Sequence, residues 1–410
     1  MAAPPPRPVL DTRRFGRTPL AFLVILGACC LVAIVALVAF VRGGPVPALT
    51  GLFLALLPVP VVLAVILYLD RLEPEPRALL AAMFGAGAGI AALTALLGHA
   101  LDTGVITVPE LGPHAGRAVA VTLGAAIGGA IFAQTLQGIV LVALLLSRRA
   151  EIDGAHDGVV YASMTGLGFA LIANVYAYAQ AERGGFGELA ATFARRGVLG
   201  PLWEPLCTSM IGLGIAYAAS RRGSSGYWAI AVGWVAAVVL NVLWNYSVTA
   251  STGRLAATDL FLFAALVAVT IVVVADRRRI VGMIRRFLPA FEGPDVVTAA
   301  DVIMLASLRM RRLGRQWARL NVGVMGKRAM AEYQLAATEL AMACNRNSLG
   351  RTMPEAFARH RDDSLSLMRA AARTVRIREP LYVPPWLGPG ERSVFLRPAA
   401  EPSGGEPVIG

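Results

Sequence analysis

Polar side chains occur inside segments of this sequence that are otherwise apolar enough to cross a membrane. Gln134 and Gln137 lie three residues apart in the stretch FAQTLQGIVL, and Asn241 and Asn245 lie four residues apart in NVLWN. Because a helix returns to the same face every three or four residues, the two members of each pair share one helix face. Such amides either bridge neighbouring helices or line a ligand pocket, and both interpretations stay open for these residues.

Glu204 has the most chemistry available to it, because it is the carboxylate of this group. An ionised carboxylate is costly in hydrocarbon, so we expect Glu204 to be protonated, paired or close to the outer interface. The alternative is that its segment begins later and leaves Glu204 among lipid headgroups. We interpret His99 and Thr208 as interfacial and packing residues. The remaining polar residues of these segments are Asn174, Tyr176 and Tyr178.

The elements that must position these residues are membrane helices. Of the 410 residues, 56% are hydrophobic and 16% are charged, a composition typical of an integral membrane protein. We therefore predict an all-α, polytopic membrane helix bundle, in which the glycine run GAAIGGA at 124–130 allows a neighbouring helix to approach closely. About eight transmembrane helices are predicted, over residues 19–41, 46–69, 78–101, 119–147, 158–181, 198–219, 227–250 and 257–275.

Arginine predicts the orientation of the bundle. It is concentrated in the N-terminal arm, in the loops DRLEPEPR, SRR and SRRG, and in DRRR after the last segment. By the positive-inside rule these parts are cytosolic, so both termini face the cytosol (N-in, C-in). Arg195 and Arg196 are an exception, because they fall outside. The arginine-rich composition also suggests a bacterial protein, located in the plasma (inner) membrane.

Other features disfavour some functional classes. The sequence has no basic stripe interleaved with aromatic residues and no zinc motif, so we expect no nucleic-acid partner. The cysteines lack CxxC spacing, which predicts packing residues and neither a disulfide framework nor a metal site. They are Cys29, Cys30, Cys207 and Cys344.

Beyond the membrane segments the sequence becomes amphipathic. Three helices are predicted over 296–374, the first capped by Thr298 and the third beginning at Pro354. The first would place Ile303 on an apolar face and Arg311 on a polar face. We favour a solvated arginine face on a small bundle over a dedicated binding surface. The predicted parts are a cytosolic arm (1–18), a transmembrane domain (19–276), a linker (277–295), a cytosolic helical domain (296–376) and a disordered tail (377–410).

Four spaced motifs carry a family resemblance. The first is YLDRLEPEPRALLAAMFGAG, from Tyr68 to Gly87, and the second is DGVVYASMTGLGFALIANVYAY, from Asp157 to Tyr178. The segments EPLCTSMIG and NVLWN follow in order. Together they resemble the PrsW-like family of intramembrane proteases, and the tail is similar to those of its actinobacterial members. The resemblance covers most of the chain from Tyr68 to about Thr352 and implies a membrane peptidase fold.

The catalytic positions that this resemblance carries over hold other residues here. The family pattern A-P-x-x-E-E-x-x-K falls on 133–141, so Gln137 takes the place of a glutamate. The family is thought to activate water with glutamate and histidine, with or without a metal. Amides cannot act as bases, and Gly, Ala and Leu side chains offer no lone pair. The family-site equivalents in this chain are Gln137, Gly138, Leu141, Ala173, Asn174, Glu204 and Asn241.

We therefore interpret the chain as a pseudoprotease, which keeps the family fold, lacks the peptidase chemistry and binds a membrane-embedded partner. No cofactor and no metal is expected, and Glu204 is the only candidate for a catalytic residue. The expected partners are the lipid bilayer and a single-pass membrane protein or transmembrane helix; no oligomeric state is predicted.

Two alternatives stay open. The first is an active intramembrane endopeptidase with a centre rebuilt around Glu204, the one case in which zinc is expected. The second is a pathway for a small solute or ion. The sequence shows no inverted repeat and no pair of helices broken by Pro or Gly, which counts against a transporter.

Overall fold

The computed structural model describes residues 45–70, 75–102, 117–148, 152, 154–221, 226–248, 252–293, 296–350 and 353–376, together with 27, 29, 30 and 33. These residues form helices joined by short turns, with isolated β-bridges near Val297. The predicted all-α fold class is therefore confirmed. The predicted arm (1–18), most of the first predicted segment (19–41) and the predicted tail (377–410) lie outside the described residues.

Six stretches of the described residues are long and apolar enough to cross a membrane, as in an integral membrane protein. They correspond to the second to seventh predicted segments. The eighth, 257–275, falls within α10 (Thr252–Phe287). The six stretches are Pro45–Leu69, Arg77–Leu97, Ile127–Arg148, Ala155–Arg183, Phe186–Ala219 and Trp228–Asn245.

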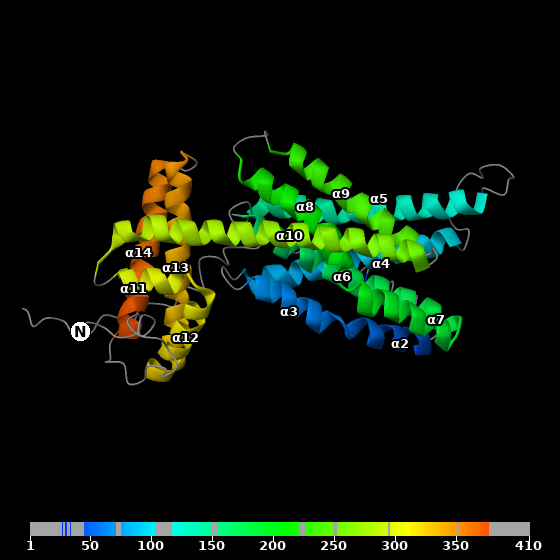
Figure 1. Cartoon of the computed structure of the whole chain (residues 1–410), viewed down its shortest axis with the longest axis horizontal. Helices are drawn as coiled ribbons and strands as arrows, with labels where there is room; N and C mark the ends of the chain where they lie inside the picture. Colours follow the sequence, from blue (N-terminus) through cyan, green and yellow to red (C-terminus); the bar gives the residue numbers. More distant parts are fainter. Residues whose placement is uncertain are drawn as a thin grey trace, which may run out of the picture. The chain divides into compact units, whose positions relative to one another are not determined.

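Contacts along the chain group Arg17–Asp276 into one unit, called the membrane unit below, and place the residues from Arg277 onward in a second unit. Figure 1 labels the helices of both units. Those that precede α10 in the membrane unit are α2 (Pro45–Leu56), α3 (Val59–Leu69), α4 (Arg77–Asp102), α5 (Arg117–Arg148), α6 (Ala155–Arg183), α7 (Phe186–Phe193), α8 (Trp203–Ala219) and α9 (Trp228–Val248).

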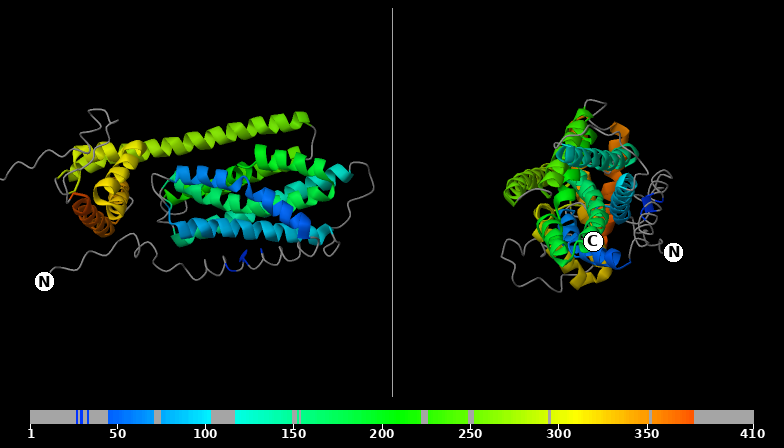
Figure 2. Two further views of the ribbon diagram at one scale, coloured as in Figure 1. Left: turned by 90° about the horizontal axis from the view of Figure 1, so that it is seen from below. Right: turned by 90° about the vertical axis from the view of Figure 1, so that its right-hand side faces the viewer.

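The central helix of the membrane unit is α6. In its apolar window 83% of the residues are buried, compared with 17% in the window of Pro45–Leu69. It packs most extensively against α4 and α8, and Figure 2 shows the long helices of the unit running roughly parallel and antiparallel to one another. Because α6 is rich in small residues, neighbouring helices can approach it closely.

Paired glycines set the distance between α6 and α8. A Cβ on Gly158 of α6 would clash with the Gly212 carbonyl of α8, and a Cβ on Gly212 would clash with the Gly158 carbonyl. The sequence predicted this kind of contact at 124–130 instead. For Gly128 and Gly129 that prediction is wrong, because among the described residues no atom outside their own helix lies within 4 Å of a Cβ built there.

Two of the apolar stretches are broken helices, contrary to the sequence prediction. The chain turns at Leu57 and Pro58 between α2 and α3, where Pro58 lacks the amide hydrogen that a continuous helix needs. It turns again at 200–202, so the predicted segment 198–219 is a continuous α-helix only from Trp203. Only the second break adjoins the polar residues discussed below.

The second unit is a small helical bundle. Its core includes Ile280, Ile284 and Leu288, which form one apolar stripe. This stripe explains why the predicted linker, 277–295, is helical as far as Phe291. After the end of α10 its helices are α11 (Ala299–Leu305), α12 (Leu308–Val322), α13 (Val324–Ser348) and α14 (Pro354–Arg376).

The first helix predicted in this unit is two helices. Thr298 and Asp301 form a capping box, which confirms the predicted start. The helix ends at Leu305, because Ser307 adopts an extended conformation and caps α12. The predicted apolar position of Ile303 is wrong, since this side chain is 56% exposed.

The predicted polar position of Arg311 is also wrong, because this side chain is only 2% exposed. Its Nε donates to the Leu305 carbonyl over 2.8 Å, and its Nη2 donates to Thr338 Oγ1 over 2.7 Å. These bonds satisfy a buried cation that amphipathic spacing alone assigns to solvent.

Candidate functional site

The polar residues that the sequence singled out converge between three helices of the membrane unit. Helix α9 packs against both α5 and α8, and each helix supplies two side chains from one face, as the spacings predict. We call this group the amide cluster. Its members are Gln134 and Gln137 of α5, Glu204 and Thr208 of α8, and Asn241 and Asn245 of α9.

A chain of hydrogen bonds runs through one half of the amide cluster. Asn245 Nδ2 donates to Asn241 Oδ1 over 2.8 Å, and Asn241 Nδ2 donates to Glu204 Oε1 over 3.0 Å. Gln134 Nε2 donates to the other carboxylate oxygen, Glu204 Oε2, over 3.4 Å. Both oxygens of Glu204 are therefore engaged by amide donors.

The other half of the cluster leaves two polar atoms without a partner. Thr208 Oγ1 lies 2.7 Å from Gln137 Oε1 and 2.9 Å from the Glu204 carbonyl oxygen. Gln134 Oε1 and Gln137 Nε2 are buried and have no hydrogen-bond partner among the described residues. Each unpaired buried polar atom costs about 1–3 kcal/mol, so its retention requires a structural or functional reason.

Glu204 lies at the positive end of the dipole of its helix. Glu204 lies in the first turn of α8, where the helix dipole stabilises an anion. The apolar stretch that contains it begins at Phe186, well before α8. Glu204 therefore lies inside this stretch, although close to the start of its own helix.

A cation that the sequence analysis treated as an exception interacts with the cluster. Arg196 has electrostatic interactions with Glu204 and Tyr178. It belongs to a π-helical segment, Ala194–Leu199, between α7 and α8, and such segments often occur at functional sites. This role of Arg196 was not predicted, because the positive-inside rule treats the residue only as an exception in an outer loop. The available signal was an arginine shortly before an intramembrane carboxylate.

Two tryptophans support the cluster at the helix break. Trp203 and Trp244 stack with their ring centroids 4.9 Å apart and share a small core with Cys207. A Cβ on Gly200 would clash with the Trp244 ring. The glycine at the break therefore lets this tryptophan of the NVLWN motif approach, and Cys207 packs as predicted.

Four family-site equivalents lie outside the amide cluster. Leu141 is buried in the core of the membrane unit, and Ala173 packs against that core. Asn174 is buried on α6, and no hydrogen bond within the described part of the chain joins it to the cluster. Gly138 follows Gln137 directly and lines a groove between α5 and α9.

This groove is open and almost wholly apolar, with a volume of about 600 Å³. Trp234 Nε1 of α9 donates to Thr135 Oγ1 of α5 over 3.2 Å, which ties the two walls together. The other lining residues include Ile139, Val142 and Tyr227. A surface of this chemistry suits an apolar helix or a lipid chain.

The donor set of the amide cluster does not fit a zinc ion. A catalytic zinc site uses three ligands drawn from His, Cys and carboxylate side chains. The cluster offers one carboxylate, Glu204, with neutral amides and a hydroxyl. Elsewhere in the described part of the chain, no three His, Cys, Asp or Glu side chains are placed to hold a metal ion.

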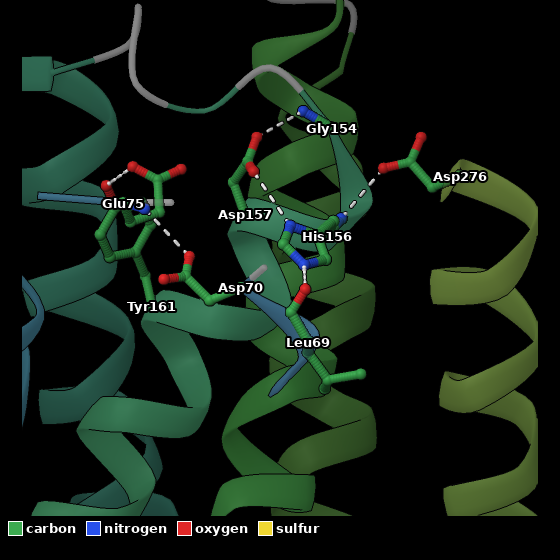
Figure 3. Close-up of polar contacts among 8 residues, drawn as sticks. All are labelled: Leu69, Asp70, Glu75, Gly154, His156, Asp157, Tyr161 and Asp276. Atoms are coloured by element: carbon green, nitrogen blue, oxygen red, sulfur yellow. Dashed lines mark hydrogen bonds and ion pairs between the residues drawn. The ribbon is translucent and has the colours of Figure 1, made fainter. Parts of the chain in front are cut away.

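A second polar cluster joins the first two sequence motifs (Figure 3). Tyr161 OH donates to Glu75 Oε2 over 2.5 Å, and the Glu75 amide donates to Asp70 Oδ1 over 3.0 Å. The His156 amide donates to Asp276 Oδ2 of α10 over 3.1 Å. These residues, with Asp157, form what we call the framework cluster, because it connects the end of α3 and the starts of α4 and α6 with Asp276 in the interior of α10.

The His156 ring lies between two acceptors, as Figure 3 shows. Nε2 is 2.5 Å from the Leu69 carbonyl oxygen and Nδ1 is 3.4 Å from Asp157 Oδ1. A carbonyl oxygen only accepts, so Nε2 carries a proton, and a proton on Nδ1 would complete the contact with an ionised Asp157. No local sequence pattern points to a role for His156, because its partners come from distant segments.

Asp70 of the framework cluster has an unusual acidity. Burial raises the pKa of its carboxyl from 3.8 to about 6, and the nearby Asp157 acts in the same direction. The hydrogen bond from the Glu75 amide and the attraction of His156 lower the pKa but only in part. Asp70 therefore takes up a proton in mild acid.

Of three comparisons with known proteins, one gives a match, to a family model. No curated protein and no solved structure matches the chain. Residues 75–275 match the family model described as PrsW family intramembrane metalloprotease. The matched region contains the whole amide cluster and most of the framework cluster. The membrane unit of the chain therefore contains a domain of the PrsW family of intramembrane proteases.

Proposed function

We propose that this protein is a catalytically inactive family member that binds a transmembrane segment of a partner in a bacterial plasma membrane. The observation that supports the proposal is the chemistry of the amide cluster. It keeps hydrogen-bonding groups at the family's catalytic positions, but Gln137 and Asn241 cannot accept a proton near neutral pH. The one carboxylate, Glu204, is engaged by amide donors on both oxygens.

The partner segment would lie along the groove between α5 and α9. Association of membrane helices depends on close packing and on hydrogen bonds, since lipid is as apolar as the helices. Because Gly138 has no side chain, a partner helix in the groove could approach α5 closely beside Gln137. A small displacement of α5 from α9 would let the partner satisfy the unpaired Gln134 Oε1 and Gln137 Nε2.

A site-specific cross-link tests this proposal. A photoreactive residue at Ile139, which lines the groove and is 57% exposed, is compared with one at Ile271 of α10, which is 62% exposed and outside the groove. The probe is a co-expressed, tagged single-pass protein with one central polar residue in its transmembrane helix. We expect a cross-link from Ile139 only, to a full-length probe.

Two results would contradict the proposal. Equal cross-linking from both positions would show that the groove is not a binding site. A shortened probe would show proteolysis, and its loss in Glu204→Gln would support the alternative of a rebuilt endopeptidase. The solute-pathway alternative draws no support from the helix breaks, because α2 and α3 contribute no member of the amide cluster.

A further inference from the structure

The second unit contains a sharp corner that the proposed membrane site does not use. Helix α12 ends and α13 begins with only Gly323 between them. Gly323 has φ +83°, a left-handed conformation that glycine adopts readily. A Cβ on Gly326 would clash with the Ala318 carbonyl oxygen, so this glycine lets the two helix ends approach. The chain therefore brings the last turn of α12 against the first turn of α13.

Large apolar side chains are exposed at this corner. Leu320 is 63% exposed, Val324 is 61% exposed and Met325 is 64% exposed. The adjoining turns are well packed, since Trp317 and Met330 are each only 8% exposed. The exposure therefore does not reflect a loose core, and a cluster of exposed apolar residues indicates an interaction surface.

The chain segment that forms the corner carries only positive charges, and the first acidic residue after it, Glu332, interacts with Arg328. Between Asp301 and Glu332 the sequence has no acidic residue. Two arginines of this stretch form hydrogen bonds within the bundle: Arg311 donates to Thr338, and Arg315 donates to Gln334. The others are exposed: Arg309 and Arg312 lie earlier in α12, and Arg319, Lys327 and Arg328 adjoin the apolar residues.

We propose that this corner docks on an anionic lipid surface, with Leu320, Val324 and Met325 entering the headgroup boundary. An apolar tip flanked by cations is the combination that binds a membrane interface. The occupant is a bilayer because the second unit continues directly from the membrane helices through α10, which is unbroken from Thr252 to Phe287. Because α10 connects the second unit to the membrane helices, this unit always remains near a bilayer.

Hydrogen exchange of the full-length protein in lipid nanodiscs tests the proposal. The first amides of a helix have no intrahelical acceptor, so those of Val324, Met325 and Gly326 exchange rapidly unless something covers them. We expect their exchange to be at least about fivefold slower in nanodiscs that contain phosphatidylglycerol than in pure phosphatidylcholine nanodiscs. Each basic residue near an anionic surface strengthens binding by roughly this factor.

Charge variants identify the cause of any protection. The triple variant Arg319→Gln, Lys327→Gln and Arg328→Gln should lose the protection. The matched control neutralises Arg346, Arg359 and Arg361, which lie at the other end of the α13–α14 hairpin, about 30 Å away along α13. This control removes the same charge from the same unit. It should keep the protection, because its three arginines lie far from the corner.

Three outcomes would overturn the proposal. Rapid exchange in both kinds of nanodisc would show that lipid does not cover the corner. Equal protection in both kinds, or equal loss in the two triple variants, would show that anionic headgroups are not recognised. Protection seen only in native membranes would assign the corner to a protein partner.

Discussion

Two amide atoms in the membrane unit, Gln134 Oε1 and Gln137 Nε2, lie buried without a hydrogen-bond partner in the described part of the chain. A membrane helix under selection for stability alone would carry apolar residues at these positions, because unpaired polar atoms lower stability. The resemblance assigns the position of Gln137 to a catalytic glutamate, and Gln134 lies on the same helix face, so the retention of both amides supports a binding role. Substitutions can show whether these glutamines belong to a binding site or only bridge neighbouring helices.

Replacing Gln137 by leucine should raise the free energy of unfolding by about 1 kcal/mol. Leucine is similar in size and removes the unpaired Nε2, and the Thr208 hydroxyl keeps the Glu204 carbonyl as its acceptor. The measurement is the apparent midpoint of thermal unfolding in detergent.

Asn241→Leu is the matched control for this prediction. It removes the donor to Glu204 Oε1, so it should lower the free energy of unfolding by about 1–3 kcal/mol. If Gln137→Leu proves as destabilising as Asn241→Leu, Gln137 is a structural bridge between α5 and α8 and not part of a retained site.

Asp70 predicts a dependence of stability on pH. Its pKa is about 6 in the folded protein and 3.8 as its ordinary value, so the folded state binds the proton more tightly. The stability that this proton contributes is present below about pH 4 and is lost as the pH rises to about 6, by at most about 3 kcal/mol.

The variant Asp70→Asn isolates this effect, because asparagine can still accept from the Glu75 amide and does not titrate. Titrations shared by both proteins cancel in the comparison. Between pH 4 and pH 7 the unfolding midpoint of the wild type should fall relative to that of Asp70→Asn, as Asp70 ionises in the wild type. Parallel profiles would show that Asp70 titrates normally.

At the scale of helices, close packing around α6 fixes the place of the amide cluster. Glycines 158 and 212 bring α6 and α8 into backbone contact, and α8 then presents Glu204 and Thr208 toward α5 and α9. The break at 200–202 sets where α8 starts. The cluster therefore depends on small residues that take no part in its chemistry.

Gly212→Ala should lower the free energy of unfolding by about 1–3 kcal/mol, because the added methyl group would overlap the Gly158 carbonyl. Gly129→Ala is the control, since its Cβ meets no other helix within the described residues, and alanine favours a helix by up to about 1 kcal/mol. Thermal midpoints of the two variants should therefore move in opposite directions. A neutral Gly212→Ala would show that α6 and α8 are not held at this distance.

The sequence predicts helices and their polar faces better than it predicts their contacts. Continuous apolar runs correctly indicated six membrane stretches, and three- and four-residue spacings correctly grouped the amides. Local patterns do not predict burial that depends on a partner elsewhere in the chain. Arg311 is an example, because it is buried through hydrogen bonds to Thr338 and to the Leu305 carbonyl. The predicted close contact at Gly128 and Gly129 failed for a similar reason, because small residues permit close packing but do not determine which helix packs there.

At the scale of the whole molecule, the family match is compatible with the proposed loss of peptidase chemistry. The motifs that carry the resemblance are in part structural, since Glu75 and Tyr161 bond to each other in the framework cluster. A chain can therefore keep these motifs and match the family over 75–275 while most of the positions that the resemblance assigns to catalysis hold amides or apolar residues. The residue-by-residue resemblance predicted this division, but the bond between Glu75 and Tyr161 could not be predicted, because it joins distant segments of the chain.

The most direct test of the central claim is cleavage of a co-expressed, tagged single-pass protein by the full-length chain, with Glu204→Gln beside the wild type. The account predicts that the tagged protein stays intact with both, because the one carboxylate in the amide cluster is held by amide donors on both of its oxygens. Cleavage by the wild type that Glu204→Gln abolishes would contradict the account and identify Glu204 as the centre of a working protease.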